Sequence, residues 1–260
     1  MANLITLEDY KDDQAIGPIL KSLKECFSWQ GYMRNLQTAA PDSEVSKRTF
    51  NSYLCRQLVD KLTKTVTDLE VGKKMVFPGG SGSHFTLLQI HKTEEGKCSF
   101  SIYNTGEGVQ YHWALIKGAD SKAQGVYTLN EVPLENFNED FFRALLEASL
   151  NIDDDFYFGE FFYEELISTL EGERESIPLK MEEFMTPQRS GTCAWKSICA
   201  YLRYNLPLDV YKCLKLKMRI KVFEVWNKLG YRLNIKKNYE SLLRKLVSSK
   251  RIYFLIVQLK

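Results

Sequence analysis

Cys193 is the residue of this sequence with the clearest potential for covalent chemistry. It follows a turn-forming stretch, 187–192, and opens a helical pattern with the apolar positions Ile198 and Leu202. The first turn of a helix offers unpaired backbone N–H groups and the positive end of the helix dipole, and both favour the nucleophilic thiolate. Gln188 stands five residues before the cysteine. Its side-chain amide and the Cys193 backbone N–H would form an oxyanion hole with two donors.

A cysteine nucleophile needs a base that accepts the thiol proton and later protonates the leaving amine. The sequence contains three histidines, His84, His91 and His112. His84 is the best placed, because it stands where the Gly/Ser-rich stretch 78–83 enters an apolar strand pattern. Catalytic side chains are often found where a loop meets a rigid element. We therefore expect His84 to be the base.

A predicted hairpin brings a third polar residue to this histidine. Strand patterns at 84–92 and 97–103 flank the short loop 93–96, which ends in glycine. In such a hairpin the end of the second strand lies beside the start of the first. Asn104 is therefore expected next to His84, where it can accept the imidazole N–H and fix its tautomer.

Each of these features has a more ordinary interpretation when it is taken alone. A cysteine at the start of a helix is more often a small buried residue than a nucleophile. A histidine that opens a strand is more often a satisfied polar residue, and Asn-Thr-Gly at 104–106 is usually a turn. The Gly/Ser-rich stretch also lacks the pattern of a phosphate-binding loop. Their order and context together favour a catalytic interpretation.

The elements that must position these residues follow from the period of the apolar positions. Helical spacing is found in the ranges 18–27, 42–72, 137–150, 156–170, 192–205, 207–229 and from Asn238 onward. Strand patterns are found in the ranges 74–77, 84–92, 97–103, 109–116 and 125–129. The stretch 252–259 fits either a helix or a strand.

This order predicts an α+β protein with a small mixed or antiparallel sheet flanked by helices. We expect an N-terminal helical region at 1–72 and a core at 73–206 with a helical insertion at about 133–175. A C-terminal helical region at 207–260 is expected to pack on that core.

Composition narrows the class of partners. The 260 residues are 44% hydrophobic and 26% charged, with a net charge of +2. Nothing in this balance favours nucleic acid or an anionic membrane as a partner, and no apolar run approaches the ~20 residues that span a bilayer. The six cysteines are scattered, without a CxxC pair. We therefore expect no metal or cofactor, free thiols, and a reducing, cytoplasmic compartment.

At the residues described above the chain resembles the Ulp/adenain-type (clan CE) cysteine peptidases, whose fold is shared by SUMO proteases and several bacterial effector deubiquitinases. That family has a His, then Asp or Asn at the end of the next strand, then Gln, then Cys at a helix start. The matching stretches are 84–88, 101–105 and 188–193, and the resemblance covers about 76–205. The chain has Phe85 where the family often has Trp and Ala194 where it often has Gly.

The resemblance implies a papain-like core with a triad of Cys193, His84 and Asn104, and Gln188 in the oxyanion hole. It implies a thiol hydrolase that cleaves after the C-terminal glycine of ubiquitin or a ubiquitin-like protein. Candidates for the walls of a narrow substrate cleft are Phe85, Trp113 and Trp195. A bacterial effector of this type would work in the cytoplasm of a host cell.

Two other functions fit the same residues. An effector-type acyltransferase would pass the acyl group from Cys193 to a Lys, Ser or Thr instead of water. A helical interaction module with a degenerate active site would bind its partner without turnover. Turnover of acetyl-coenzyme A would indicate the transferase, and the absence of any labelling of the thiols would favour the inactive module. The oligomeric state is left open by the sequence.

Overall fold

The structure is a computed structural model that describes residues 16–38, 44–80, 84–117, 120–150, 158–175, 184–187 and 193–228. Backbone contacts divide the chain into two compact units, of which one runs from Ile19 to Tyr204 and the other comprises the segments on either side. The first two residues of the helix expected at 42–72, the helix expected from Asn238 and the stretch 252–259 lie outside the described residues.

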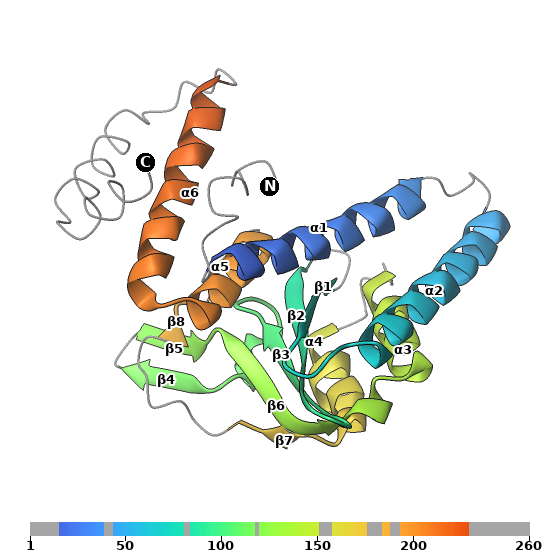
Figure 1. The fold of residues 1–260 in the computed structure, drawn as a ribbon. Coiled ribbons are helices and arrows are strands. Elements are labelled where there is room, and N and C mark those ends of the chain that lie inside the picture. Colours follow the sequence, from blue (N-terminus) through green and yellow to red (C-terminus); the bar gives the residue numbers. More distant parts are fainter. Residues whose placement is uncertain are drawn as a thin grey trace, which may run out of the picture. The chain divides into compact units, whose positions relative to one another are not determined.

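The larger unit is built on an antiparallel sheet with the strand order β1-β2-β3-β6-β7 (Figure 1). Its strands are β1 (Lys74–Gly79), β2 (Thr86–Glu94), β3 (Lys97–Tyr103), β6 (Val126–Pro133) and β7 (Glu173–Arg174). The predicted hairpin is confirmed, because β2 pairs with β3 and the chain turns at Gly96, whose φ is +75°. Leu87 pairs with Tyr103, so the start of β2 lies beside the end of β3.

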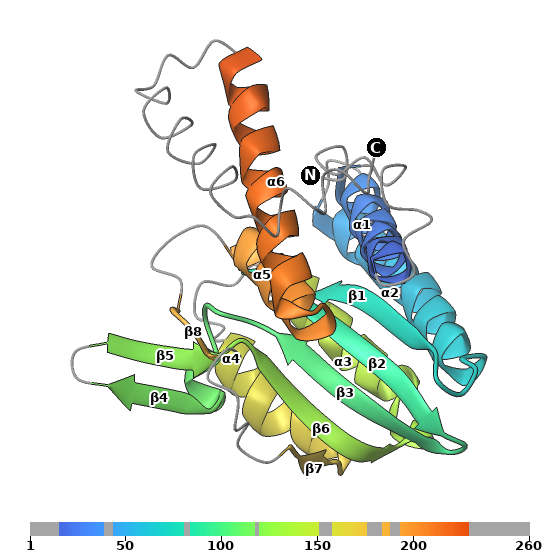
Figure 2. The ribbon, with the colours of Figure 1, turned by 60° about the vertical axis from the view of Figure 1, so that its left-hand side comes forward.

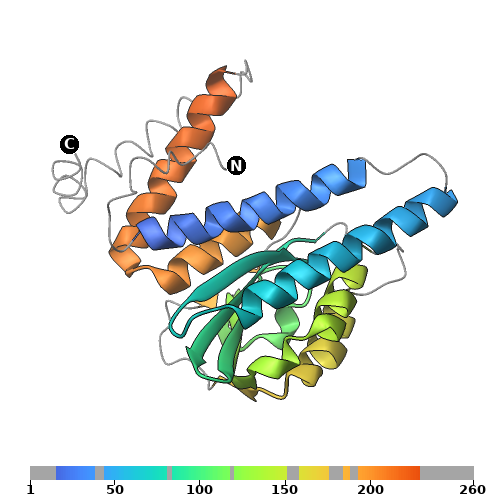
Figure 3. The ribbon, with the colours of Figure 1, turned by 45° about the vertical axis from the view of Figure 1, so that its right-hand side comes forward.

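Helices cover both faces of this sheet (Figure 3). One face carries α2 (Glu44–Thr67), α3 (Glu139–Leu150), α4 (Phe158–Glu160), the π-helix η5 (Phe161–Leu166) and the 3₁₀ helix η6 (Ile167–Leu170). The other face carries α1 (Gly17–Thr38) and α5 (Cys193–Asn205). The chain is therefore a mixed α+β protein with antiparallel sheets, as predicted.

The main core lies between the sheet and α2, α3 and η5. Leu88, Ile90 and Phe100 are fully buried there, and Phe77 meets Phe142 of α3 with ring centroids 6.1 Å apart. On the opposite face, Tyr103 of β3 meets Tyr201 of α5 edge to face at 5.0 Å. Burial of large apolar side chains on both faces explains why β2 reads as an apolar run without alternation.

A second, smaller sheet lies beside the beginning of β6 (Figure 2). It consists of β4 (Ala114–Lys117), β5 (Asp120–Gln124) and β8 (Phe184–Met185). The prediction of one strand over 109–116 is wrong, because Val109–Tyr111 forms the 3₁₀ helix η3 and the strand begins only at Ala114. Gly108, with φ +83°, provides the left-handed turn that starts η3.

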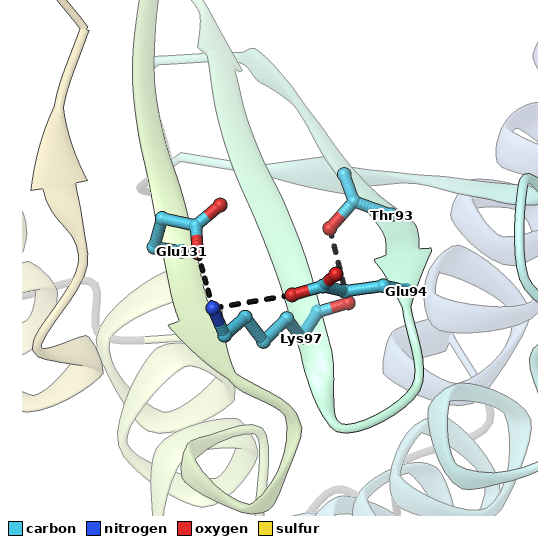
Figure 4. Close-up of polar contacts among 4 residues, drawn as sticks. All are labelled: Thr93, Glu94, Lys97 and Glu131. Atoms are coloured by element: carbon cyan, nitrogen blue, oxygen red, sulfur yellow. Dashed lines mark hydrogen bonds and ion pairs between the residues drawn. The ribbon is translucent and has the colours of Figure 1, made fainter.

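The β2–β3 turn is also joined to β6 by an ion pair at the far end of the sheet. Lys97 Nζ lies 2.5 Å from Glu131 Oε2 and 3.1 Å from Glu94 Oε1 (Figure 4). Glu131 has φ +56° at an irregularity of the β3–β6 pairing, where the register shifts between Cys98 and Phe100. The pair is exposed, so the sheet depends on its core and not on this contact.

The second unit contains α6 (Leu208–Lys228), which begins after Pro207 as the sequence predicted. Tyr211, Leu214 and Met218 are buried positions along this helix. The remaining element of the larger unit is the short 3₁₀ helix η4 (Leu134–Asn136) between β6 and α3. Within the described ranges, none of the helices combines the length and the apolar character that crossing a membrane requires.

Candidate active site

His84 and Asn104 are brought together by the β2–β3 pairing. His84 stands two residues before β2 and Asn104 directly follows β3. His84 Nε2 lies 3.1 Å from Asn104 Oδ1. The exposed fraction is 7% for His84 and 0% for Asn104, so the contact is shielded from competing water.

The surroundings of Asn104 fix the orientation of its amide group. Oδ1 accepts the backbone N–H of Gly106 at 2.9 Å, and Nδ2 donates to the backbone carbonyl of Glu107 at 2.5 Å. If the amide were flipped, Nδ2 would face the N–H of Gly106, and Oδ1 would face the carbonyl of Glu107, so neither hydrogen bond could form. Because Oδ1 can only accept, His84 Nε2 must carry the proton of the neutral ring. Nδ1 of His84 is then the basic nitrogen.

The electrostatics of His84 keep the imidazole ready to accept a proton. Burial lowers the pKa of His84, while the hydrogen bond from its ring to Asn104 and the negative charge of Glu107 act in the opposite direction. The neutral ring is therefore the resting form at neutral pH. Glu107 supplies the negative charge that Asn104 itself lacks, and its carboxylate also accepts the N–H of Gly159 at 3.3 Å.

The backbone that leads into His84 depends on a glycine. Gly80 has φ +118°, and a Cβ at this position would collide with the backbone carbonyl of His84. A glycine is therefore required for the chain to approach His84 this closely. Residues 81–83, the centre of the Gly/Ser-rich stretch, lie outside the described residues.

Cys193 is the first residue of α5, where the sequence predicted a helix start, and its side chain is partly exposed. The other described cysteines are buried. Burial raises the pKa of Cys26, and it raises the pKa of Cys98 to about 11, so these thiols stay protonated. Access and a helix N-terminus therefore distinguish Cys193 from the thiols of the core.

The position of α5 on the sheet is fixed by contacts along the helix. Ser197 is fully buried and its Oγ donates to the backbone carbonyl of Phe85 at 3.2 Å. A Cβ on Gly125 would lie 3.1 Å from Ala200 Cβ, so this glycine lets α5 pack closely against the start of β6. Together with the ring contact of Tyr201, these contacts hold the middle of α5 where β2 and β6 begin and β3 ends.

This packing relates the cysteine to the histidine. Cys193 and Ser197 are four residues apart and share a face of α5, with a rise of ~6 Å between them. Ser197 contacts the residue that directly follows His84. Cys193 thus lies about one helical turn along α5 from Ser197, the helix residue that contacts Phe85 next to the imidazole. Among the described residues, no hydrogen bond joins Cys193 Sγ to His84, whose side-chain hydrogen bond is to Asn104.

Two residues that the sequence did not indicate belong to the surroundings of Asn104. Tyr163, from η5, has its hydroxyl 3.3 Å from Asn104 Nδ2 and 2.7 Å from His112 Nε2. His112 in turn has Nδ1 2.8 Å from the backbone carbonyl of Gln124. The only signal in the sequence is the presence of a third histidine, within the strand pattern predicted at 109–116. Its partner lies 51 residues away and could not be paired with it from sequence.

The remaining predicted site residues are Gln188 and the three aromatic residues of the expected cleft, which differ in burial. Gln188 lies outside the described residues. The Phe85 side chain is buried, and Trp195 in the first turn of α5 is half-buried. Trp113 is covered by the Arg174 guanidinium at 4.1 Å from its ring, and its Nε1 donates to the backbone carbonyl of residue 175 at 3.2 Å. The described part of the chain contains no group of three metal-ligating side chains.

Comparison with known proteins found no relative of this chain. The family models that were searched gave no match to the chain, and no curated protein matched its sequence.

Proposed function

We propose that the chain is a cysteine peptidase or isopeptidase of the Ulp/adenain type, with Cys193 as nucleophile, His84 as base and Asn104 as orienting residue. The observation that carries the proposal is the buried His84–Asn104 hydrogen bond next to Phe85, which α5 contacts through Ser197. These contacts support a site in which a base of fixed tautomer works with a partly exposed cysteine at a helix start.

The reaction follows from these assignments. His84 Nδ1 accepts the thiol proton, and the Cys193 thiolate attacks the carbonyl carbon of the scissile bond. The backbone N–H of Cys193 and the amide of Gln188 donate to the oxyanion that forms. The proton on Nδ1 passes to the leaving amine, which departs and leaves a thioester on Cys193. His84 then removes a proton from water, and hydroxide attack releases the carboxylate product and the thiol.

The proposed substrate is ubiquitin or a ubiquitin-like protein, cleaved after its C-terminal glycine. Phe85, Trp113 and Trp195 are the proposed walls of the cleft that admits the glycines. A side-chain-free substrate terminus suits a cleft bounded by aromatic residues, because larger residues would collide with the rings. The substrate class rests on the family resemblance of the catalytic stretches.

The test uses C-terminal fluorophore conjugates of ubiquitin and of ubiquitin-like proteins, together with the matching vinyl-sulfone probes. We expect hydrolysis of one of these conjugates by the wild-type chain, and its loss in Cys193→Ala with unchanged circular dichroism. Cys55→Ala and Cys213→Ala are the matched controls and are expected to retain activity. Equal losses in all three variants would refute the assignment of Cys193.

The same preparation distinguishes the other functions. Turnover of acetyl-coenzyme A that depends on Cys193, without hydrolysis of any conjugate, would replace the hydrolase by an acyltransferase. Absence of both activities, together with no labelling of Cys193 by any vinyl-sulfone probe, would show that the chain does not use this cysteine as a nucleophile.

A further inference from the structure

We propose that Tyr163 and His112 are positioning residues of the site, which act through Asn104 to hold His84 in its Nε2-protonated tautomer. This inference rests on the proposed function of Cys193 and His84. It assigns a role to the helical segment 158–170, which lies within the helical insertion expected at about 133–175.

The donors and acceptors form a chain with one direction. His84 Nε2–H donates to Asn104 Oδ1, and Asn104 Nδ2–H donates to the Tyr163 hydroxyl. The Tyr163 O–H donates to His112 Nε2, and His112 Nδ1–H donates to the backbone carbonyl of Gln124. Because that carbonyl can only accept, it fixes the tautomer of His112 and, through each link, the direction of the whole chain.

Both added residues stay neutral, which the chain requires. Burial lowers the pKa of His112 to about 4, so its Nε2 remains an acceptor at neutral pH. Burial raises the pKa of Tyr163 far above its ordinary range, so the hydroxyl keeps its proton. A protonated His112 would lose the lone pair that accepts from Tyr163. The chain is therefore intact throughout the neutral pH range.

The ring of Tyr163 is held rigidly, so its hydroxyl has a defined position. Tyr111 stacks on it at 5.0 Å with an interplanar angle of 9°, and Tyr127 and His112 meet it edge to face. A Cβ on Gly108 would lie 2.5 Å from the Tyr163 ring, so the loop after Asn104 packs directly against this residue. Tyr163 comes from a π-helical turn, a rare geometry that often occurs at functional sites.

The hydrogen bond to Tyr163 satisfies the second hydrogen of the buried Asn104 amide. Asn104 Nδ2 carries two hydrogens, of which one meets the carbonyl of Glu107 and the other meets Tyr163. Without Tyr163 one hydrogen would be buried without a partner, and the amide would be freer to rotate away from His84. Orientation of the imidazole would then be lost in part.

The experiment compares Tyr163→Phe with Tyr111→Phe. The first variant removes the hydroxyl from the chain and keeps the packed ring. The second removes a hydroxyl from the stacked neighbour, which donates to Glu164 at the surface. Nitrogen-15 NMR of histidine-labelled protein reports the tautomer of His84 and the exchange rate of its Nε2–H, and turnover is measured on the fluorophore conjugate.

We expect Tyr163→Phe to lower kcat about fivefold, the effect of one hydrogen bond, with KM unchanged. We also expect faster exchange of the His84 Nε2–H and a mixed tautomer. His112→Gln is the second variant and should change the same quantities in the same direction. Tyr111→Phe should match the wild type in both measurements.

The outcomes separate this inference from the proposed function. Equal tautomer and kcat in Tyr163→Phe and Tyr111→Phe would overturn the positioning role. A raised KM with unchanged kcat would overturn it as well, since it would indicate a role in substrate binding. A Tyr163-dependent His84 tautomer in a chain without any Cys193-dependent activity would support the positioning and refute the proposed function.

Discussion

Asn104 carries no charge, so its contribution to His84 must come from orientation. The amide is held by the backbone of the following loop and by Tyr163, which fixes Oδ1 as an acceptor for the imidazole. The negative charge that acts on His84 comes instead from the nearby Glu107, which raises the pKa of the imidazole against the effect of burial. Orientation and charge are thus supplied by two different residues.

The first prediction compares His84→Ala with Asn104→Ala. Removal of the proposed base should lower kcat by about 10²–10⁴-fold, the usual value of general acid–base catalysis. Removal of the orienting amide should cost about tenfold, because the imidazole remains and only its hydrogen bond is lost. Turnover of the fluorophore conjugate by both variants, with circular dichroism as a control of folding, measures this order. The reverse order would indicate that another residue is the base.

The second prediction concerns Glu107. Its negative charge raises the pKa of His84 against the effect of burial, so Glu107→Gln should lower that pKa. The acid limb of kcat/KM, which reports protonation of the free base, should then move to lower pH. Glu164→Gln is the matched control, because that exposed carboxylate is bound to the Tyr111 hydroxyl. A movement of the limb to higher pH would contradict the assigned role of Glu107.

At the scale of elements, the loop after β3 and the π-helical turn depend on each other. Gly108 adopts φ +83° and lies against the Tyr163 ring, so Gly108→Ala adds both a backbone penalty and a collision. Gly96→Ala adds the backbone penalty alone, because Gly96 has φ +75° and no heavy atom beyond its chain neighbours lies within 4 Å of where its Cβ would be.

The third prediction follows from this pair of glycines. Gly96→Ala should reduce the free energy of unfolding by about 1 kcal/mol. Gly108→Ala should reduce it by about 1–3 kcal/mol more and should lower kcat, since Tyr163 must shift. Urea unfolding of both variants measures the difference. Equal destabilisation would show that the Tyr163 ring moves aside without loss of stability, and that it does not hold the loop after β3 in place.

The elements predicted from sequence are those with strong local signals. The β2–β3 hairpin has apolar runs and a terminal glycine, and α5 has a turn-rich stretch before a regular apolar stripe. The alternation in 109–116 predicts a strand, yet the chain turns at Gly108 and the His112 side chain is buried with its Nδ1 2.8 Å from the Gln124 carbonyl. The helix expected at 156–170 contains a π-helical segment that no local pattern indicates.

For the whole molecule, the alternation of helical and strand periods was enough to predict an α+β protein with an antiparallel sheet. The adjacency of His84 and Asn104 could be derived because one hairpin joins them. The buried contact between Tyr163 and His112 could not, because it joins segments whose packing depends on the complete core. The hydrogen-bond partner of a buried polar group often lies far away in the chain. The periodicity of a single sequence carries no information about which residue that partner is.

The buried His112 makes the stability of the whole molecule depend on pH. Its pKa is lowered from 6.5 to about 4, first by burial and further by the positive charge of Arg174, against the hydrogen bond to Gln124. Between these two values the unfolded chain binds a proton that the folded chain does not. The stabilisation is therefore complete above pH ~6.5 and is lost as the pH falls toward 4, by about 3 kcal/mol in total.

The fourth prediction is that His112→Gln removes most of this dependence. The free energy of unfolding of the wild type should fall between pH 7.5 and pH 4.5 by about 2–3 kcal/mol more than that of the variant. His91→Gln, at a half-buried position on β2, is the control and should retain most of the wild-type slope, because its imidazole is less desolvated. Urea titrations at both pH values measure the difference. Parallel pH dependence in wild type and His112→Gln would show that His112 is not held neutral in the fold, and the Tyr163 hydroxyl would then lose His112 Nε2 as its acceptor.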